Sequence, residues 1–399
     1  MNLIEDEVVE TAPAAADDGL WRTAGAWRGV GTAVGIFALT RIVQLLMLAW
    51  LTDAAHDQGG LRGRLLIWDG GWFLKVATTG YPHGYTYDMA GQLSGNELAF
   101  FPLYPMLIRL ADALGVSPDT AAIGVTWVAS AGLAVALHLL GTSLYGRRTG
   151  WALVAICCSA PVSVVFSMAY SEALFLALVA GMLVAAHRRV WWAAGLLGLA
   201  AALTRPTGAA AALALAVAAL LEIRRIRRDA VPASIVPPIA AAVLALAGMP
   251  AFLTWVGLRV GDPSAWFRIQ AAGWGTSFDY GASTVKFLAT TLSVGDGWVP
   301  VSVALILLAA LVAAVVALAG KPWPPLAVYG VVAMVLVYGQ AGFYHSKPRL
   351  LVPVLLTLLP GAIAAGRARP RVAVLSITAW AAFGLWYGAY LVAVWPYTI

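Results

Sequence analysis

An all-helical, polytopic membrane protein is the fold class that the sequence predicts, and three observations predict it. The chain of 399 residues is 61% hydrophobic, and its mean hydropathy is +0.83. Only 11% of the residues are charged, whereas a soluble domain carries about 25%. The apolar residues also form runs near the roughly 20 residues that a helix needs to cross a bilayer. A globule of this size in water needs more charged residues on its surface than this chain has. Lipid must therefore be the solvent for most of its surface.

Eleven apolar runs are candidates for membrane-spanning α-helices. The run 191–204 is short for a full crossing, and Pro206 ends it, because proline lacks the backbone N–H that a helix interior needs. We therefore expect a helical hairpin whose turn, Thr204 to Gly208, lies below the membrane surface. The eleven runs are 28–51, 119–144, 149–168, 171–187, 191–204, 207–222, 234–258, 299–319, 322–340, 349–366 and 372–394.

Basic residues set the predicted orientation, because Lys and Arg concentrate in cytoplasmic loops. With the N-terminus in the cytoplasm, every short, strongly basic loop falls on the inner side, and eleven crossings leave the C-terminus outside. The tail 1–25 is acidic, so it is no signal peptide, which needs a basic start; we expect it to be disordered. The net charge of +6 therefore marks topology in the cell membrane, not nucleic-acid binding. The inner residues are Arg147, Arg148, Arg188, Arg189, Arg224, Arg225, Arg227, Arg228, Lys321, Arg367, Arg369 and Arg371.

Two long connections within the transmembrane domain, 26–399, then lie on the extracytoplasmic side. They are 53–118 and 259–298, and both are rich in aromatic residues. Loops of this length are usually functional when they are not disordered. In the first loop, apolar residues share one helical face over 68–77 and again over 103–114. We expect two interfacial helices there, lying in the plane of the lipid headgroups.

Asp69 is the residue that most clearly suggests chemistry. It stands at the first turn of the predicted interfacial helix, between Trp68 and Trp72. An acid at this position can simply cap the helix, or it can act as a general base at the membrane edge. The paired glycines Gly70 and Gly71 favour the second interpretation, because glycine lets a substrate approach the backbone closely.

Several motifs occur in an order that matches one known family. The run from Trp68 to Leu74, followed by Gly80-Tyr81-Pro82, resembles the first lumenal loop of the PIG-V family of mannosyltransferases, in the GT-C superfamily. The last element of that family is an Arg-Tyr near the penultimate helix, and here it reads Arg349-Leu350 without the aromatic residue. The likeness covers about residues 28–365. The other matching segments are Phe100-Phe101-Pro102-Leu103-Tyr104-Pro105, Ser167 to Glu172, Thr204 to Gly208, and Asp262-Pro263 through Trp266, Phe267, Gln270 and Trp274-Gly275.

The resemblance implies an inverting glycosyltransferase of the GT-C type. Such enzymes move mannose from a polyprenyl-phosphate-mannose donor to a lipid-linked acceptor on the extracytoplasmic face, and Asp69 matches the position of their base. The residues agree, because an inverting transfer needs one base and the carboxylate pair of most glycoside hydrolases is not evident. The chain has no Asp-x-Asp, so we expect neither a metal nor another cofactor. The Cys157-Cys158 pair reads as apolar core rather than a disulfide.

Outer-side cations are candidates for the phosphate of the donor, because the planar guanidinium can bind two of its oxygens. Arg205 lies at the helix break, where a cation at membrane depth is functional by default, unless it snorkels to the headgroups. Lys347 and Arg349 begin a helix beside His345 and either contact substrate or anchor that helix at the membrane edge. Arg109 either contacts substrate or pairs with an acid three residues later. The cations are Arg109, Arg205, Arg268, Lys347 and Arg349.

The remaining polar and aromatic candidates each leave two interpretations open. Glu172 either holds sugar hydroxyls or stabilises the start of its helix. Arg41, inside the first apolar run, needs either a lipid phosphate or an acid such as Glu172. Either Asp262 or Asp279 could serve as a second base or contact the acceptor. The tryptophans of the second loop could stack on a sugar or only line the interface. The predicted substrate-binding set is Trp68, Trp72, Arg109, Glu172, Arg205, Asp262, Trp266, Gln270, Trp274, His345, Lys347 and Arg349.

Two other functions remain open at this point. A transporter or lipid flippase would show a polar site at the membrane midplane or two related halves, whereas here the polar residues gather at one face. A GT-C transferase for another sugar would share every motif. The composition, rich in Ala, Val, Leu and Arg, is typical of a high-GC bacterial coding sequence. We therefore expect a phosphatidylinositol mannoside or another envelope glycan as acceptor rather than a glycosylphosphatidylinositol.

Overall fold

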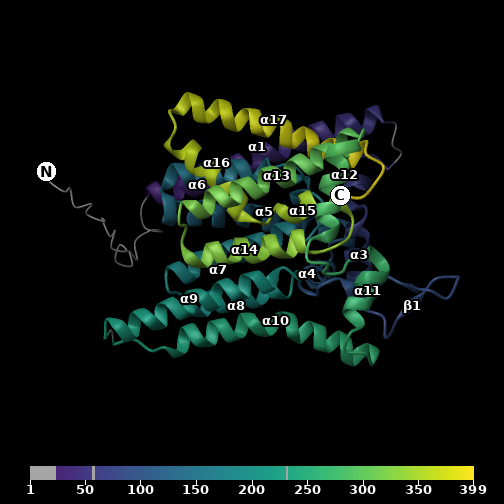
Figure 1. Cartoon of the computed structure of the whole chain (residues 1–399), viewed down its shortest axis with the longest axis horizontal. Coiled ribbons are helices and arrows are strands. Elements are labelled where there is room, and N and C mark those ends of the chain that lie inside the picture. The colour runs from purple at the N-terminus through teal and green to yellow at the C-terminus, as the bar shows by residue number, and fades with distance from the viewer. Residues whose placement is uncertain (1–23, 56–58, 231) are drawn as a thin grey trace.

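The computed structural model describes residues 24–55, 59–230 and 232–399, which form a bundle of helices running back and forth along one long axis (Figure 1). The first helix, α1, begins at Ala24, so the predicted tail lies outside the described residues except for its last two positions. The β-structure in the described part of the chain is a two-stranded hairpin, β1 (Thr86–Tyr87) with β2 (Leu93–Ser94), and an isolated bridge between Phe278 and Gln340.

Each of the eleven apolar runs forms a helix or a pair of helices. The short run that Pro206 was predicted to end becomes α8, and the chain turns at 203–207 into α9, as expected for a helical hairpin. The helices are α1 (Ala24–Ala54), α5 (Pro118–Tyr145), α6 (Arg147–Cys158), α7 (Glu172–His187), α8 (Trp191–Ala202), α9 (Gly208–Arg228), α10 (Val236–Val260), α13 (Trp298–Ala319), α14 (Pro324–Gly339), α15 (Lys347–Leu351) with α16 (Leu355–Arg367), and α17 (Pro370–Ala393). The 3₁₀ turns η2 (Ser163–Phe166) and η3 (Tyr344–Ser346) precede α7 and α15.

Length and hydropathy qualify five of the described helices as membrane spans, namely α1, α5, α10, α13 and α17. The pair formed by η3–α15 and α16 bends by 54° and makes a sixth if counted as one span, while α7, α8 and α14 are shorter apolar helices. On α1, Leu39, Leu46 and Trp50 are 63%, 66% and 67% exposed, as expected for a surface that faces lipid. The predicted class of a multi-pass helical membrane protein is confirmed; the number of eleven crossings stays a prediction.

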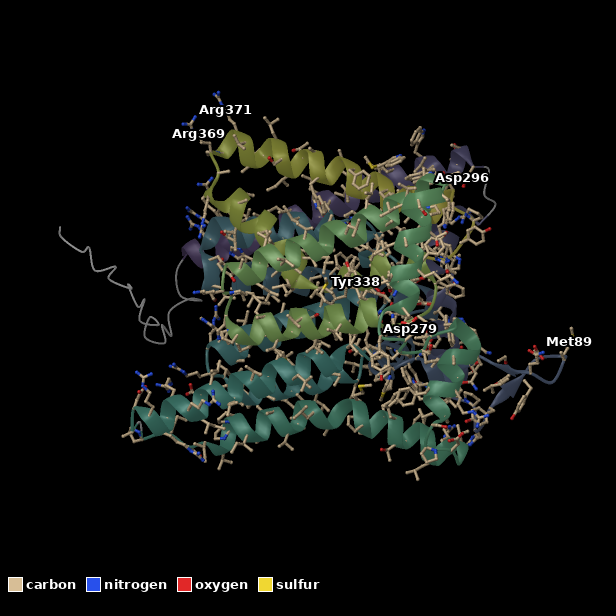
Figure 2. All side chains as sticks on the ribbon, in the orientation of Figure 1. Met89, Asp279, Asp296, Tyr338, Arg369 and Arg371 are labelled. Atoms are coloured by element: carbon tan, nitrogen blue, oxygen red, sulfur yellow. The ribbon has the colours of Figure 1, made fainter. Side chains whose placement is uncertain are left out.

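The bundle has two chemically different ends. One, here called the basic end, carries the connections α5–α6, α7–α8, α9–α10, α13–α14 and α16–α17. These connections and the helix ends that flank them hold every residue of the predicted inner basic set. Figure 2 shows Arg369 and Arg371 at this end and Asp279 and Asp296 at the opposite end. The basic loops therefore share one side, as the topology prediction requires, while the membrane and the direction of insertion stay predictions.

The opposite end, here called the site end, is built from the two long loops. Both predicted loop helices exist, while their place at the lipid interface stays a prediction. On α4, Tyr104 and Ile108 are buried, whereas Met106 and Leu110 are 63% and 58% exposed. The hairpin, the 3₁₀ turn η1 and three of the α-helices were not predicted, because their apolar runs are too short to give a periodic pattern. The elements are α2 (Gly60–Leu66), α3 (Asp69–Thr79), η1 (Glu97–Ala99), α4 (Leu103–Ala113), α11 (Ala265–Trp274) and α12 (Ala282–Val294).

Arg41 is fully buried in the bundle. Its guanidinium donates to the Gln44 side chain at 2.7 Å and to the Ser163 carbonyl at 2.7 Å, and also to the carbonyl of Cys158. These carbonyls lie where α6 ends and η2 begins, so the helix no longer supplies their donors. Both predicted partners of Arg41, a lipid phosphate and Glu172, are therefore wrong: the arginine satisfies the interrupted backbone of its neighbour.

Candidate active site

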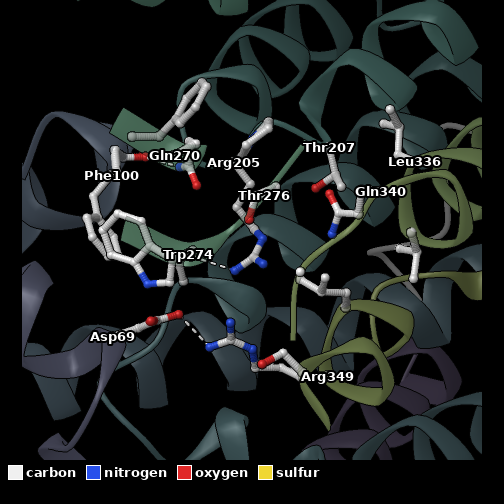
Figure 3. A pocket seen from close by; sticks show the side chains of 18 of the residues that line it. Asp69, Phe100, Arg205, Thr207, Gln270, Trp274, Thr276, Leu336, Gln340 and Arg349 are labelled. Carbon is white, nitrogen blue, oxygen red and sulfur yellow. Dashed lines mark hydrogen bonds and ion pairs between the residues drawn. The ribbon is translucent and has the colours of Figure 1, made fainter. Parts of the chain in front are cut away.

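A cavity of about 210 Å³ opens at the site end, between the two long loops and the turns that follow α8 and α14. Figure 3 shows charged side chains on one part of its wall and aromatic ones on another. The residues with polar or aromatic side chains that line it are Asp69, Phe73, Phe100, Phe101, Ser171, Thr204, Arg205, Thr207, Trp266, Gln270, Trp274, Thr276, Gln340, Phe343, Ser346, Lys347 and Arg349.

Asp69 begins α3 as predicted, and the residue before it has a strained backbone. Trp68, directly before it, has a φ of +56°, a conformation that costs free energy in a bulky residue and clusters at functional sites. The Asp69 carboxylate accepts an ion-paired hydrogen bond from Nη1 of Arg349 at 2.5 Å, and 21% of its side chain stays exposed. The acid therefore faces the cavity and is not consumed as a helix cap.

Of the two glycines after Asp69, Gly70 serves packing. A Cβ on Gly70 would lie 3.3 Å from the Cβ of Ala169 and 3.4 Å from its carbonyl oxygen, so the missing side chain lets α3 rest on the segment before α7. Gly71 is exposed and has open space around it. Neither glycine lines the cavity, and the close approach of a substrate to this backbone stays a prediction.

A buried carboxylate holds the two arginines of the site. Glu172 opens α7 and is fully buried, with Oε1 lying 2.8 Å from Nη1 of Arg205 and 3.5 Å from Nε of Arg349. Nη1 of Arg205 also donates to Oγ of Ser171 at 3.0 Å. Glu172 does not line the cavity, so the structure places it behind the arginines and not against a substrate.

Arg349 finds its aromatic neighbour elsewhere in the chain. Its guanidinium carbon lies 5.1 Å from the ring centre of Tyr170, within the range of a cation–π contact. Tyr170 precedes Glu172 by two positions, so one short segment supplies both the ring and the counter-charge. The motif that lacks an aromatic residue after Arg349 in sequence therefore has one beside it in space.

Lys347 brings a third cation to the wall of the cavity. It is 3% exposed, and its ammonium donates to the carbonyls of Val337 at 2.8 Å and Gln340 at 2.7 Å. An ammonium has three donors, so one remains for a ligand. Counted with Arg205 and Arg349 against the two carboxylates of Asp69 and Glu172, the three cations leave one net positive charge in the described site.

The opposite wall is aromatic. Phe100 stacks on Trp72 with ring centres 5.8 Å apart, and Trp274 meets the edges of both at 5.3 Å and 5.7 Å. Trp266 and Gln270, one turn apart on α11, both donate to the carbonyl of Ala99, at 3.3 Å and 3.0 Å. The second long loop is thereby fastened to the first, and the Trp274 ring is held at the cavity.

Besides Glu172, three predicted site residues with polar side chains lie outside the cavity lining. Arg109 is exposed on α4, and among the described residues it forms no ion pair with Asp112. Asp262 accepts hydrogen bonds from Tyr85 at 2.5 Å and from Arg268 at 3.0 Å. It therefore fastens the segment 84–96, which contains β1 and β2 and is here called the hairpin arm. His345 is buried and stacks on Phe343 with ring centres 5.3 Å apart. Trp68 and Trp72 also fall outside the lining, although Trp72 supports its aromatic wall.

Several lining residues were not predicted. Thr207, Thr276, Gln340 and Ser346 all face the cavity, and Figure 3 shows Thr207 and Gln340 beyond Arg205. Thr207 belongs to the helix-break motif, and its hydroxyl has no hydrogen-bond partner in the described structure. Gln340 ends an otherwise apolar helix, and an amide at that position was the available signal.

The chain is similar in sequence to known proteins over part of its length. No family model matches the chain. It is 33% identical over 161 residues to GPI alpha-1,6-mannosyltransferase 2 of Mus musculus, which covers 37% of this chain and 30% of that protein. It is 34% identical over 138 residues to GPI mannosyltransferase 2 of Drosophila pseudoobscura pseudoobscura, covering 32% and 27%. The predicted resemblance is confirmed. The matched region spans less than a third of each of these relatives.

The sequence predicts no metal ion in the site. Within 24–55, 59–230 and 232–399, the structure brings together no group of three or more His, Cys, Asp or Glu residues suited to a metal ion. Cys157 and Cys158 are both free and buried, as expected for core residues. That the reaction needs no metal or other cofactor stays a prediction.

Proposed function

We propose that the chain is an inverting mannosyltransferase that uses a polyprenyl-phosphate-mannose donor and a lipid-linked acceptor on the extracytoplasmic face. One observation carries the proposal: the Asp69 carboxylate and the Arg349 guanidinium meet at the wall of a cavity that Arg205 and Lys347 also line. A proton acceptor therefore lies beside cations suited to phosphate, at the end where the two long loops converge.

In the proposed reaction, Asp69 accepts the proton of the acceptor hydroxyl. The freed oxygen electron pair attacks the anomeric carbon of the donor as the bond from that carbon to the phosphate oxygen breaks. The phosphate leaves with the bonding electrons, and the anomeric configuration inverts. Among the described residues that line the cavity, Asp69 is the one carboxylate, which suits a single displacement with one base.

The cations supply the electrostatic part of the mechanism. A polyprenyl-phosphate sugar is a phosphodiester with one negative charge, which balances the net positive charge of the described site. The leaving polyprenyl phosphate gains a second negative charge, and cations already aimed at it stabilise that charge in the transition state. Arg205 points into the space between Trp274 and Arg349 (Figure 3), where it would contact the phosphate.

The aromatic wall and the ledge of interfacial helices would place the two substrates. Trp274 and Phe100 offer apolar ring surface on the side of the cavity opposite Arg205, and a sugar ring stacks on such a surface. The acceptor would approach across α3 and α4; the exposed apolar residues Met106 and Leu110 of α4 favour the lipid interface. Membrane lipids and a lipid-linked glycan are accordingly the proposed partners.

The proposal is tested with purified protein, a radiolabelled polyprenyl-phosphate mannose and a lipid extract as acceptor. Wild type should form labelled glycolipid, and Asp69→Asn should lose about 100-fold or more of the rate while still binding donor. Asp112→Asn, an exposed acid at the same end, is the matched control and should be unaffected. Unchanged turnover in Asp69→Asn excludes it as base. Transbilayer movement without a new glycosidic bond would indicate a flippase, and preference for another polyprenyl-phosphate sugar would identify a different transferase.

A further inference from the structure

A second cavity, an apolar groove of about 670 Å³, runs between α1, α6 and α17 and shares no residue with the candidate active site. Its walls are aliphatic along most of its length, with Leu39 and Val43 from α1, Ala155 from α6, and Val374 from α17. The groove is therefore lateral and open to lipid, and nothing in the proposed reaction uses it.

The length of the groove matches one leaflet of a bilayer. Its lining on α17 extends from Pro370 to Leu385, and fifteen residues of α-helix rise by about 22 Å. A whole bilayer with headgroups is about 40–45 Å thick, so the groove is about as long as one lipid molecule. It begins at the basic end and stops at Leu385, eight residues before α17 ends, where Met47 and Ser159 complete its lining.

The mouth of the groove is strongly basic. Arg148 lines the groove itself and uses one donor on the carbonyl of Ala368, at 2.7 Å, which leaves most of its five N–H groups for a ligand. Arg147 at the start of α6, and Arg369 and Arg371 at the start of α17, are exposed at the same end. In the part of the chain that the structure describes, none of these four arginines has a carboxylate partner.

We propose that this groove binds one anionic phospholipid from the leaflet at the basic end. The phosphate lies on Arg148 and the neighbouring arginines, and an acyl chain follows the aliphatic walls toward Leu385. The lipid is distinct from the proposed sugar donor, because the groove opens at the end opposite Asp69. Positive charge alone would attract anionic lipids loosely, whereas a groove one leaflet long holds a single molecule in place.

Native mass spectrometry of the full chain in detergent tests this proposal with two probes of equal chain length, phosphatidylglycerol and phosphatidylcholine. Wild type should retain one phosphatidylglycerol with at least a tenfold preference. Arg148→Gln should lower phosphatidylglycerol retention about fivefold, the effect of removing one arginine near an anionic headgroup. Ala373→Trp, which fills the groove, should abolish retention; Ala382→Phe obstructs it further along, in case the first variant does not fold.

Arg224→Gln is the matched control, because Arg224 is exposed at the basic end but outside the groove. It should keep the wild-type lipid preference. Equal retention of both lipids by wild type would overturn the proposal, as would a loss in Arg224→Gln as large as in Arg148→Gln. Retention of phosphatidylglycerol by a folded Ala373→Trp or Ala382→Phe would also overturn it. None of these outcomes depends on transferase activity.

Discussion

Nη1 of Arg349 lies 2.5 Å from Oδ2 of Asp69, although 280 residues separate the two in sequence. The contact joins the first long loop to the helix pair that precedes α17, so the first and last parts of the site form one unit. Glu172 lies against the same guanidinium from the buried side. The proposed base is thus positioned by a cation that is itself positioned by a second acid.

Replacing Arg349 with lysine should therefore impair transfer even though the charge is kept. A lysine ammonium is a point charge and cannot reach both carboxylates as the planar guanidinium does. We expect Arg349→Lys to lower the initial rate about 100-fold, the usual cost of one lost transition-state donor, measured with labelled donor. Arg109→Lys, at the same end but outside the cavity, should retain the wild-type rate. Equal activity of both variants would exclude Arg349 from the site.

Glu172→Gln should destabilise the fold as well as the site. Removing the acid leaves Arg205 and Arg349 without their buried counter-charge, and breaking a buried pair typically costs about 3–5 kcal/mol. Thermal unfolding in detergent should show a clearly lower midpoint together with weaker donor binding. Glu222→Gln is the control: Glu222 pairs with Arg189 and Arg225, whose side chains are 42% and 32% exposed, so about 1 kcal/mol is expected. Equal losses in the two variants would contradict the assigned role.

Arg41→Met should weaken the fold and leave the chemistry intact. The substitution strips donors from the buried carbonyls of Cys158 and Ser163, at about 1–3 kcal/mol for each unsatisfied group. We expect a lower unfolding midpoint but an unchanged rate per folded molecule at a temperature where the variant is folded. Arg28→Met removes an exposed arginine from the same helix and should change neither quantity. A selective loss of rate in Arg41→Met would show that Arg41 belongs to the site.

Asp262→Asn should release the hairpin arm. Hydrogen bonds from Tyr85 and Ser264 hold the pKa of Asp262 well below its usual range, and burial, followed by the bond to Asp262, raises the pKa of Tyr85. A depressed acid pKa gives stability that is present above the unfolded value of about 3.9 and is lost as pH falls through the folded value. The contact should therefore persist from about pH 5 to 9.

Hydrogen–deuterium exchange of residues 84–96 provides the measurement for this contact. After correction for intrinsic exchange, protection should be constant over that pH range in wild type and lower in Asp262→Asn. Asp279→Asn is a suitable control, because Asp279 accepts its hydrogen bonds from Gly281 and Ser283 at the start of α12. A pH-dependent loss of wild-type protection between about pH 5 and 9 would contradict the assignment.

The helices were largely predictable because in lipid their sequences must be apolar for most of a crossing. The break at Pro206 and the start of α3 at Asp69 followed from local rules for proline and for acids at helix ends. The α11 and α12 helices escaped prediction, because each runs for only a few turns and packs through long-range contacts such as Gln270 with Ala99. No local pattern carries that information.

The site was predictable in its residue types and less so in its partners. Asp69, Arg205, Lys347 and Arg349 were singled out and do line one cavity. Asp262 was grouped with them because it is also a charged residue in an outer loop, yet its carboxylate pairs with Tyr85 and Arg268. Sequence shows which groups are costly to bury, whereas the pairing that makes burial tolerable depends on segments far apart in the chain.

The position of Glu172 behind both arginines has a consequence for turnover. Because the acid is enclosed, the two guanidinium groups remain spaced and oriented whether or not a substrate is present. The electrostatic cost of placing two cations close together is met during folding. The two groups therefore need not reorient when negative charge develops on the leaving phosphate. Such a preorganised pair of cations would stabilise the transition state, in which the leaving phosphate gains charge, more than it stabilises the bound substrate.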